Sequence, residues 1–337
     1  MDRCSLRLAT LCLLAVAAAS PAQDSQPRVG APSLLGTPPS SPPGDSLPPL
    51  RDPFSASDQG GSEEEKPANP PFQKKDIRDN AFLVEEAYNQ EKGVVQHIFN
   101  WVNFWDRTPE SNTRNFLATY TMELPLGSQD HQFSFTTQFL TAFEKPLTGP
   151  ATLQGDVGDT FLNYRYQLLA NDDFLWCAPR FSLIVPSGDK RFGSGTGEMG
   201  YQFNLPLSRY GDLFDFHFNA GTTITPHVSL PLASGLASPR HDLLGYNLGA
   251  SAFLKPKTNL NAFVELLALW NDEIDDVGAR RRNTQVLINP GVRYAVCQRE
   301  EVEWIVGVSV PIGLTRDSPD IGVFAYMSVE HTFHKTN

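Results

Sequence analysis

Beyond its first residues the sequence lacks any apolar run of the roughly 20 residues that a membrane-spanning helix needs. Cysteine is scarce, with four residues and no CxxC pair, so the chain has no disulfide framework. Cys177 and Cys297 follow the leader, either as two ordinary thiols or as one disulfide. A net charge of −11 without a basic stripe argues against nucleic acid as a partner. If the chain spans a membrane, it must do so as a closed β-barrel.

The N-terminus has the pattern of a secretory signal peptide. Arg3 and Arg7 precede a short apolar stretch, and "SPA" at 20–22 offers a small-residue cleavage site, so we predict a signal peptide over 1–22. Residues 23–80 are rich in Pro, Ser, Gly and charge, which predicts a disordered linker. Residues 81–93 predict a short helical lead-in that ends at Gly93.

Residues 94–333 divide into about twelve runs with the two-residue alternation of β-strands. In "DTFLNYRYQLL" (159–169), apolar or aromatic side chains alternate with Asn163, Arg165 and Gln167. The run at 258–270 is less regular, because Phe263 shares a face with Glu265. Such strands fit either a soluble sandwich with its polar face outward or a membrane barrel with its apolar face toward lipid.

The connections between the strands distinguish these two folds. Tight turns near 127–130, 171–173, 209–212, 256–258 and 298–300 alternate with longer connections at 106–113, 144–156, 187–196, 227–241, 271–283 and 314–319. Short turns on one side and long loops on the other are typical of outer-membrane barrels. We therefore predict an all-β fold, a transmembrane antiparallel up-and-down β-barrel of about 12 strands over 94–333.

Several segments also resemble a known family. They are "GDVGDTFLNYRYQLL", "APRFSLIVPSGD", "GTGEMGYQFNLPLS" and "FHFNAGTTITP". They are similar to the family of outer-membrane transporters named for the MetA pathway of phenol degradation. "FLVEEAYNQEKGVVQHI" resembles the segment that precedes the barrel in planctomycete-like members. The resemblance covers roughly 82–333 and implies an outer-membrane barrel that moves small molecules.

No catalytic or metal-binding motif accompanies these strands. GxSxG, HExxH and P-loop patterns are absent, and no serine motif accompanies His97 or His131, so we predict no catalytic residue, metal or cofactor. Charged side chains on the polar faces are the candidate lumen residues, and they are Arg165, Arg180, Asp215, His217, Glu265, Arg293 and Glu303. They either line a conducting constriction or pair into a structural network, since side chains largely fill a narrow barrel.

Three functions follow from this pattern. The first is an outer-membrane channel for small molecules that diffuse through a polar lumen. The second is a non-conducting structural or interaction protein of the cell envelope, and the third is a lipid-acting barrel enzyme. The expected partners are outer-membrane lipid, an unidentified solute and the barrel-assembly machinery. If Arg165 faces a wet lumen, Arg165→Ala should cost far less stability than Tyr164→Arg on the lipid face, which is expected to cost about 2–4 kcal/mol.

Overall fold

The structure is a computed structural model, and it describes residues 76–333 except 109–110, 147, 149, 173, 192–193, 233–235, 276 and 300. The predicted signal peptide (1–22) and the predicted linker up to residue 75 lie outside the described residues. Among those residues, no helix has the length and apolar character needed to cross a membrane.

The described chain is built almost entirely of antiparallel strands. In chain order they are β1 (Val94–Arg107), β2 (Ser111–Leu126), β3 (Ser128–Pro146), β4 (Thr152–Val157), β5 (Thr160–Tyr166), β6 (Leu169–Ala170), β7 (Trp176–Cys177), β8 (Arg180–Val185), β9 (Gly200–Arg209), β10 (Phe214–Val228), β11 (His241–Lys257), β12 (Leu260–Ile274), β13 (Arg280–Arg299), β14 (Val302–Ser309), β15 (Ile312–Gly313) and β16 (Ile321–Thr332).

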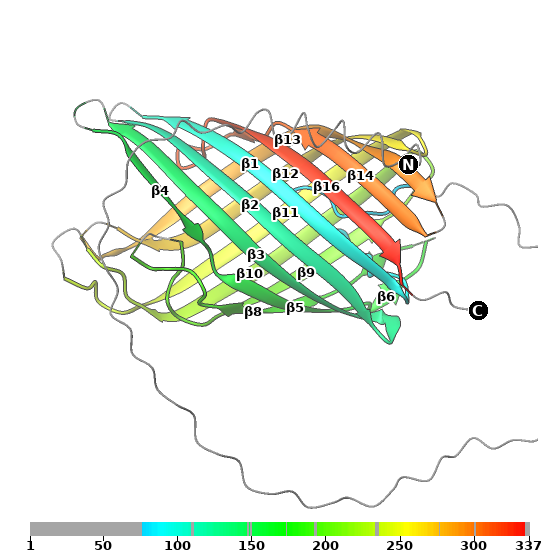
Figure 1. Cartoon of the computed structure of the whole chain (residues 1–337), viewed down its shortest axis with the longest axis horizontal. Coiled ribbons are helices and arrows are strands. Elements are labelled where there is room, and N and C mark those ends of the chain that lie inside the picture. Colours follow the sequence, from blue (N-terminus) through cyan, green and yellow to red (C-terminus); the bar gives the residue numbers. More distant parts are fainter. Residues whose placement is uncertain are drawn as a thin grey trace, which may run out of the picture. The chain divides into compact units, whose positions relative to one another are not determined.

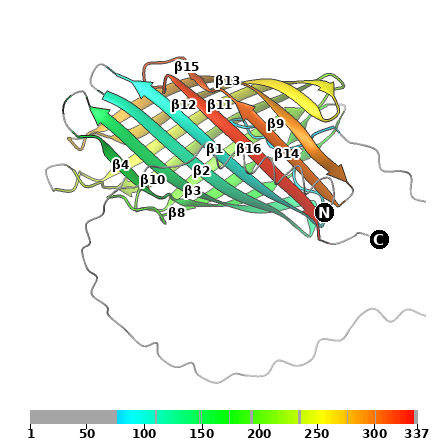
Figure 2. The ribbon, with the colours of Figure 1, turned by 45° about the horizontal axis from the view of Figure 1, so that its top comes forward.

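These strands form a closed barrel (Figure 1). β4, β5 and β6 follow one another along one wall strand, as do β7 with β8 and β14 with β15, so the wall has 12 strands. Each wall strand pairs with its neighbours in the chain, and β1 closes the circle by pairing with β16 (Figure 2). The prediction of a 12-stranded antiparallel barrel is confirmed, and a two-sheet sandwich is excluded.

The wall has a polar inner face and an apolar outer face. In β5, Tyr164 is 42% exposed on the outside whereas Arg165 is 2% exposed inside. β10 repeats the pattern, with Phe214, Phe216 and Phe218 exposed. Period-two alternation produces this division, since successive side chains of a strand point to opposite faces. A continuous apolar exterior is the surface that lipid requires of a membrane barrel.

The two ends of the barrel differ in their connections. At the tight-turn end, β2 and β3 are joined by Gly127 alone, whose φ of +79° favours glycine. Val94 and Thr332 are paired here, so the barrel begins and ends at this end. At the long-loop end, several predicted loops are largely strand. Pairing continues as far as Arg107 with Asn112 and Ile274 with Arg280, so the loop boundaries predicted at 106–113 and 271–283 were wrong.

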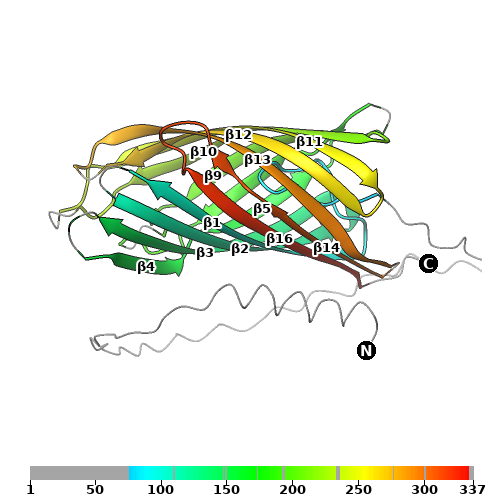
Figure 3. The same ribbon diagram turned by 90° about the horizontal axis from the view of Figure 1, so that it is seen from above.

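The lead-in to the barrel is not the predicted helix. Residues 76–91, here called the inner segment, form an irregular coil inside the barrel, where Figure 3 shows it in blue between the walls. In a helix, the backbone N–H groups would donate to backbone carbonyls of the same segment. Here several of them donate to side chains of the barrel wall instead. Glu85 N–H donates to Asn219, Ala87 N–H to Ser208 and Gln90 N–H to Gln132. The linker boundary predicted at 80 was also too late, because Ile77 and Asp79 are buried.

Candidate functional site in the barrel lumen

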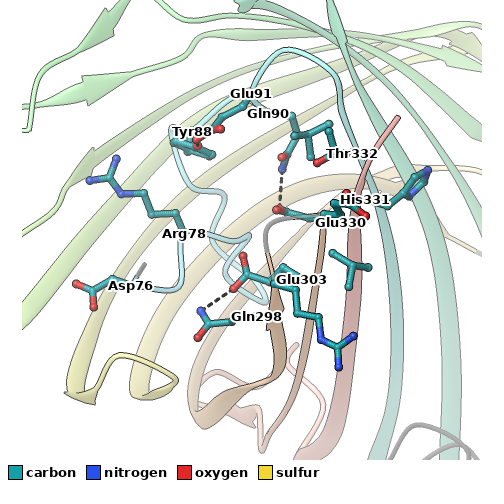
Figure 4. Close-up of a pocket in the computed structure, with 14 residues that line it drawn as sticks. Asp76, Arg78, Tyr88, Gln90, Glu91, Gln298, Glu303, Glu330, His331 and Thr332 are labelled. Carbon is teal, nitrogen blue, oxygen red and sulfur yellow. Dashed lines mark hydrogen bonds between the residues drawn. The ribbon is translucent and has the colours of Figure 1, made fainter. Parts of the chain in front are cut away.

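The inner segment enters and leaves the lumen at the tight-turn end. Near its start, the Asp76 carboxylate lies 3.0 Å from the Lys255 ammonium. Near its end, Gln90 donates to Glu330 at 3.1 Å, and the chain then continues into β1 (Figure 4). Leu83 lies between these two limbs, at the apex. The segment therefore folds back on itself within the barrel.

Glu265 on β12 holds the apex. Its carboxylate oxygens accept hydrogen bonds from the backbone N–H groups of Phe82 at 3.0 Å, Leu83 at 3.0–3.1 Å and Val84 at 3.2 Å. Asn289 adds a fourth donor at 2.7 Å, and Glu265 is fully buried. Four N–H donors thus converge on the two oxygens of one buried carboxyl group. Glu265, predicted to face the lumen, is thus a ligand for the backbone of the inner segment.

Glu85 pairs with two predicted lumen arginines. Its carboxylate lies 3.1 Å from Arg165 Nη1 and 3.0 Å from Arg180 Nε, and Asn204 donates to it at 2.7 Å. Burial by itself raises the pKa of Glu85, but the charges of Arg180 and Arg165 outweigh burial and hold the pKa below its ordinary value. Arg165 therefore faces a partner carboxylate from the chain's own lead-in.

Arg293 forms a second ionic contact, with Glu86. Its Nη1 lies 2.9 Å from the Glu86 carboxylate and also donates to the Asp79 carbonyl at 2.6 Å. The guanidinium stacks over Phe253, 4.3 Å from the ring centroid. Both charged partners are almost completely buried, at 1% exposure each. Removal of either would leave an uncompensated buried charge, which costs about 3–5 kcal/mol.

Phe82 makes the main aromatic contact between the inner segment and the wall. Its ring centroid lies 4.6 Å from that of Phe263, 5.1 Å from Phe324 and 4.9 Å from Tyr326. A Cβ at Gly307 would approach the Phe82 ring to 2.4 Å, so glycine leaves the space that the ring fills. Phe263, the apolar residue on the polar face of its strand, therefore packs against the inner segment.

The other three predicted lumen residues lie nearer the tight-turn end. Asp215 is 3.0 Å from Lys255, which also contacts Asp76. His217 Nδ1 hydrogen-bonds Ser208 at 2.8 Å, and its Nε2 lies 3.6 Å from Glu86. Glu303 accepts a hydrogen bond from Gln298 at 2.8 Å (Figure 4).

Sequence reasoning missed the residues on the inner segment, namely Asp79, Phe82, Glu85 and Glu86. Asp79 accepts hydrogen bonds from Tyr326 at 2.7 Å and Ser328 at 2.6 Å. The signal available was "FLVEE", in which two acids directly follow three apolar residues just before a domain with buried arginines.

Two hollows lie on the long-loop side of Leu83, and together we call them the vestibule. Their volumes are about 350 Å³ and 290 Å³, and both are lined by Leu83, Glu85, Arg180 and Gln202. The smaller one reaches Asn271, close to the end of β12. The inner segment therefore separates the vestibule from a hollow of about 470 Å³ at the tight-turn end, drawn in Figure 4.

The part of the chain that the structure describes contains no group of three His, Cys, Asp or Glu residues arranged to hold a metal ion. His97 and His131 hydrogen-bond the hydroxyls of Tyr120 and Tyr164 at 2.8 and 2.7 Å. Cys177 is a buried free thiol, so it does not pair with Cys297.

No protein-family model and no curated relative matches the sequence. Among solved structures, the barrel is similar to an outer membrane channel from Pseudomonas putida F1, with a TM-score of 0.53 and 9% identity over 73% of this chain and 98% of the channel. The transport unit of the autotransporter AIDA-I from Escherichia coli superposes with a TM-score of 0.47 and 9% identity, over 72% of this chain and 91% of that one. The first likeness shows the fold, which is that of outer-membrane β-barrels.

Proposed function

We propose that the protein is an outer-membrane channel for small molecules and that its inner segment gates the lumen at the tight-turn end. The observation that carries the proposal is the way in which the inner segment is held inside the barrel. Its partners come from nearly every wall strand, and among the described residues its backbone continues into the wall at β1. A segment held by side-chain contacts alone can leave the lumen without unfolding the wall.

The location and family belong to the same proposal. The apolar exterior supports insertion into outer-membrane lipid, and assembly of such a barrel calls for the barrel-assembly machinery. The motifs at 155–226 and the fold likeness support membership in the transporter family named for the MetA pathway of phenol degradation. In this account a solute enters the vestibule and passes when the inner segment moves aside.

A second candidate is a non-conducting envelope protein. The ion pairs of Glu85 and Glu86 with Arg165, Arg180 and Arg293 favour it, because each pair resists removal of the inner segment. The two functions differ in a single property, which is whether the inner segment ever leaves the barrel lumen.

Planar-bilayer recording tests the choice. Glu265→Gln keeps the size of the side chain but replaces one of the two acceptor oxygens that hold the apex with an amide donor, so we expect more frequent or larger current steps than in the natural chain. Glu144→Gln, at an exposed position on β3, is the matched control and should behave as the natural chain. If no variant shows current steps at any voltage while its gel migration remains heat-modifiable, the channel proposal fails and the envelope protein stands.

A further inference from the structure

We infer that the vestibule is a binding site for an uncharged, polyhydroxylated ring compound of the monosaccharide class. This inference rests on the proposed channel function, since it names the solute that would occupy the lumen. It rests on two observations. Amide and hydroxyl side chains line most of the two hollows, and each charged side chain in the described lining has an oppositely charged partner.

Amide and hydroxyl side chains form most of the vestibule wall. The larger hollow is lined by Thr119, Thr121, Thr136 and Gln138, and Gln202 faces both hollows. Several bond to each other across strands, as Thr121 does to Thr136 at 2.8 Å and Gln202 to Thr223 at 3.0 Å. A hydroxyl or amide has further donor and acceptor capacity after one such bond. The wall can therefore both donate to and accept from a ligand that carries many hydroxyls.

The charged side chains of the vestibule are already paired. Glu85 is held by Arg165 and Arg180, at 3.1 and 3.0 Å. Glu123, the remaining acid of the lining, lies 3.7 Å from Arg165. An anionic or cationic solute would thus enter without a free counter-charge in the described lining, and burial of an unpaired charge is costly. The site selects against charge.

Part of the lining is apolar. Leu83 at the apex and Leu267 and Leu269 of β12 border the smaller hollow. A pyranose ring has two apolar C–H faces and a rim of hydroxyls, so it complements a wall with leucines on one side and amides on the other. A purely apolar solute would leave the amides without partners, at a cost of about 1–3 kcal/mol for each such group. The larger hollow, about 350 Å³, falls within the size range of small-molecule sites, roughly 300–1,000 Å³.

Equilibrium dialysis of the full chain, folded in detergent, tests this inference with three sugars of one ring size at pH 7. Glucose should bind, and glucuronate and glucosamine should bind at least about tenfold more weakly. Gln202→Leu should weaken glucose binding about fivefold, the effect of one lost hydrogen bond. Gln154→Leu, the same change at an exposed position of β4, should bind as the natural chain does.

The inference is overturned if a charged sugar binds as tightly as glucose, if none of the three binds, or if Gln202→Leu and the natural chain bind alike. Binding of benzyl alcohol without binding of glucose would also overturn it, and would identify an apolar solute. Dialysis needs no conduction, so glucose binding by a chain without current steps would reject the channel and retain the site. Current steps without glucose binding would reject the binding site and retain the channel.

Discussion

At the scale of single residues, Glu85 is the carboxylate that pairs with both Arg165 and Arg180. Glu85→Gln keeps the shape of the side chain but removes this shared carboxylate. We expect a loss of about 1–3 kcal/mol in the free energy of unfolding, less than for a fully buried pair, because Arg165 keeps Glu123 at 3.7 Å and Arg180 is partly exposed. Thermal unfolding, followed by heat-modifiable migration on a gel, measures the loss. A variant as stable as the natural chain would show that Glu85 is dispensable.

The same pair predicts a dependence on pH. The pKa of Glu85 is lowered from 4.5 in the folded protein. A carboxyl with a depressed folded pKa stabilises fully above its unfolded pKa and loses that contribution as the pH falls through the folded value. The stability difference between the natural chain and Glu85→Gln should therefore be constant above about pH 4.5 and shrink below it. A difference that grows on acidification would contradict the pairing.

Arg165 illustrates how the structure revises a residue-level expectation. Facing a wet lumen, it would tolerate replacement by alanine. Because its side chain is buried against Glu85 and also bonds the Tyr88 carbonyl at 2.5 Å, Arg165→Ala should instead be strongly destabilising. The alternation of β5 indicates which side Arg165 faces, but it contains no information about what lies there.

At the scale of elements, the strands of the wall are the lipid contact. Leu248 is 43% exposed near the middle of β11, and Leu254 is 36% exposed near its tight-turn end. We expect Leu248→Arg to cost about 2–4 kcal/mol and Leu254→Arg about 0–1 kcal/mol, because the cost of a cation falls with distance from the bilayer midplane. Unfolding of both variants in lipid vesicles measures the two values. Equal costs would contradict the placement of β11 across the bilayer.

The sequence predicts the strands of the wall but not the conformation of the inner segment. The wall was predictable because each strand carries its own period of two and pairs with its neighbour in the chain. The inner segment has no such period, and its bonds run to distant residues. Glu86 lies 207 positions from Arg293, for example. The apolar start and Gly93 suggested a helix, but Glu265 and the amides of the wall take the hydrogen bonds that a helix would have used.

At the scale of the whole molecule, the barrel is a continuous wall around the inner segment, which we propose to be movable. The wall is continuous, as β1 pairs with β16, while the inner segment is bound inside by ion pairs, hydrogen bonds and two apolar clusters. In the proposed channel, conduction depends on one equilibrium, between the inner segment bound in the lumen and the inner segment displaced from it. The wall residues of the vestibule, such as Gln202 and Leu267, stay on the barrel in either state, whereas Leu83 and Glu85 move with the inner segment, so solute binding and gating are measured separately.

A disulfide between the inner segment and the wall tests this account most directly. A Cβ at Gly249 would lie 3.0 Å from Val84 Cγ2. That matches the spacing of roughly 3 Å between a sulfur and the opposite Cβ in a disulfide whose S–S bond is about 2 Å. The variant combines Val84→Cys with Gly249→Cys in a Cys177→Ser background. Val84→Cys alone in that background is the control.

Planar-bilayer current through the double variant is the measurement. We predict that the oxidised protein shows no current steps, that reductant restores them, and that the control conducts under both conditions. Current that is the same in the oxidised and reduced double variant, with the disulfide verified by mass spectrometry, would contradict displacement of the inner segment as the gating step.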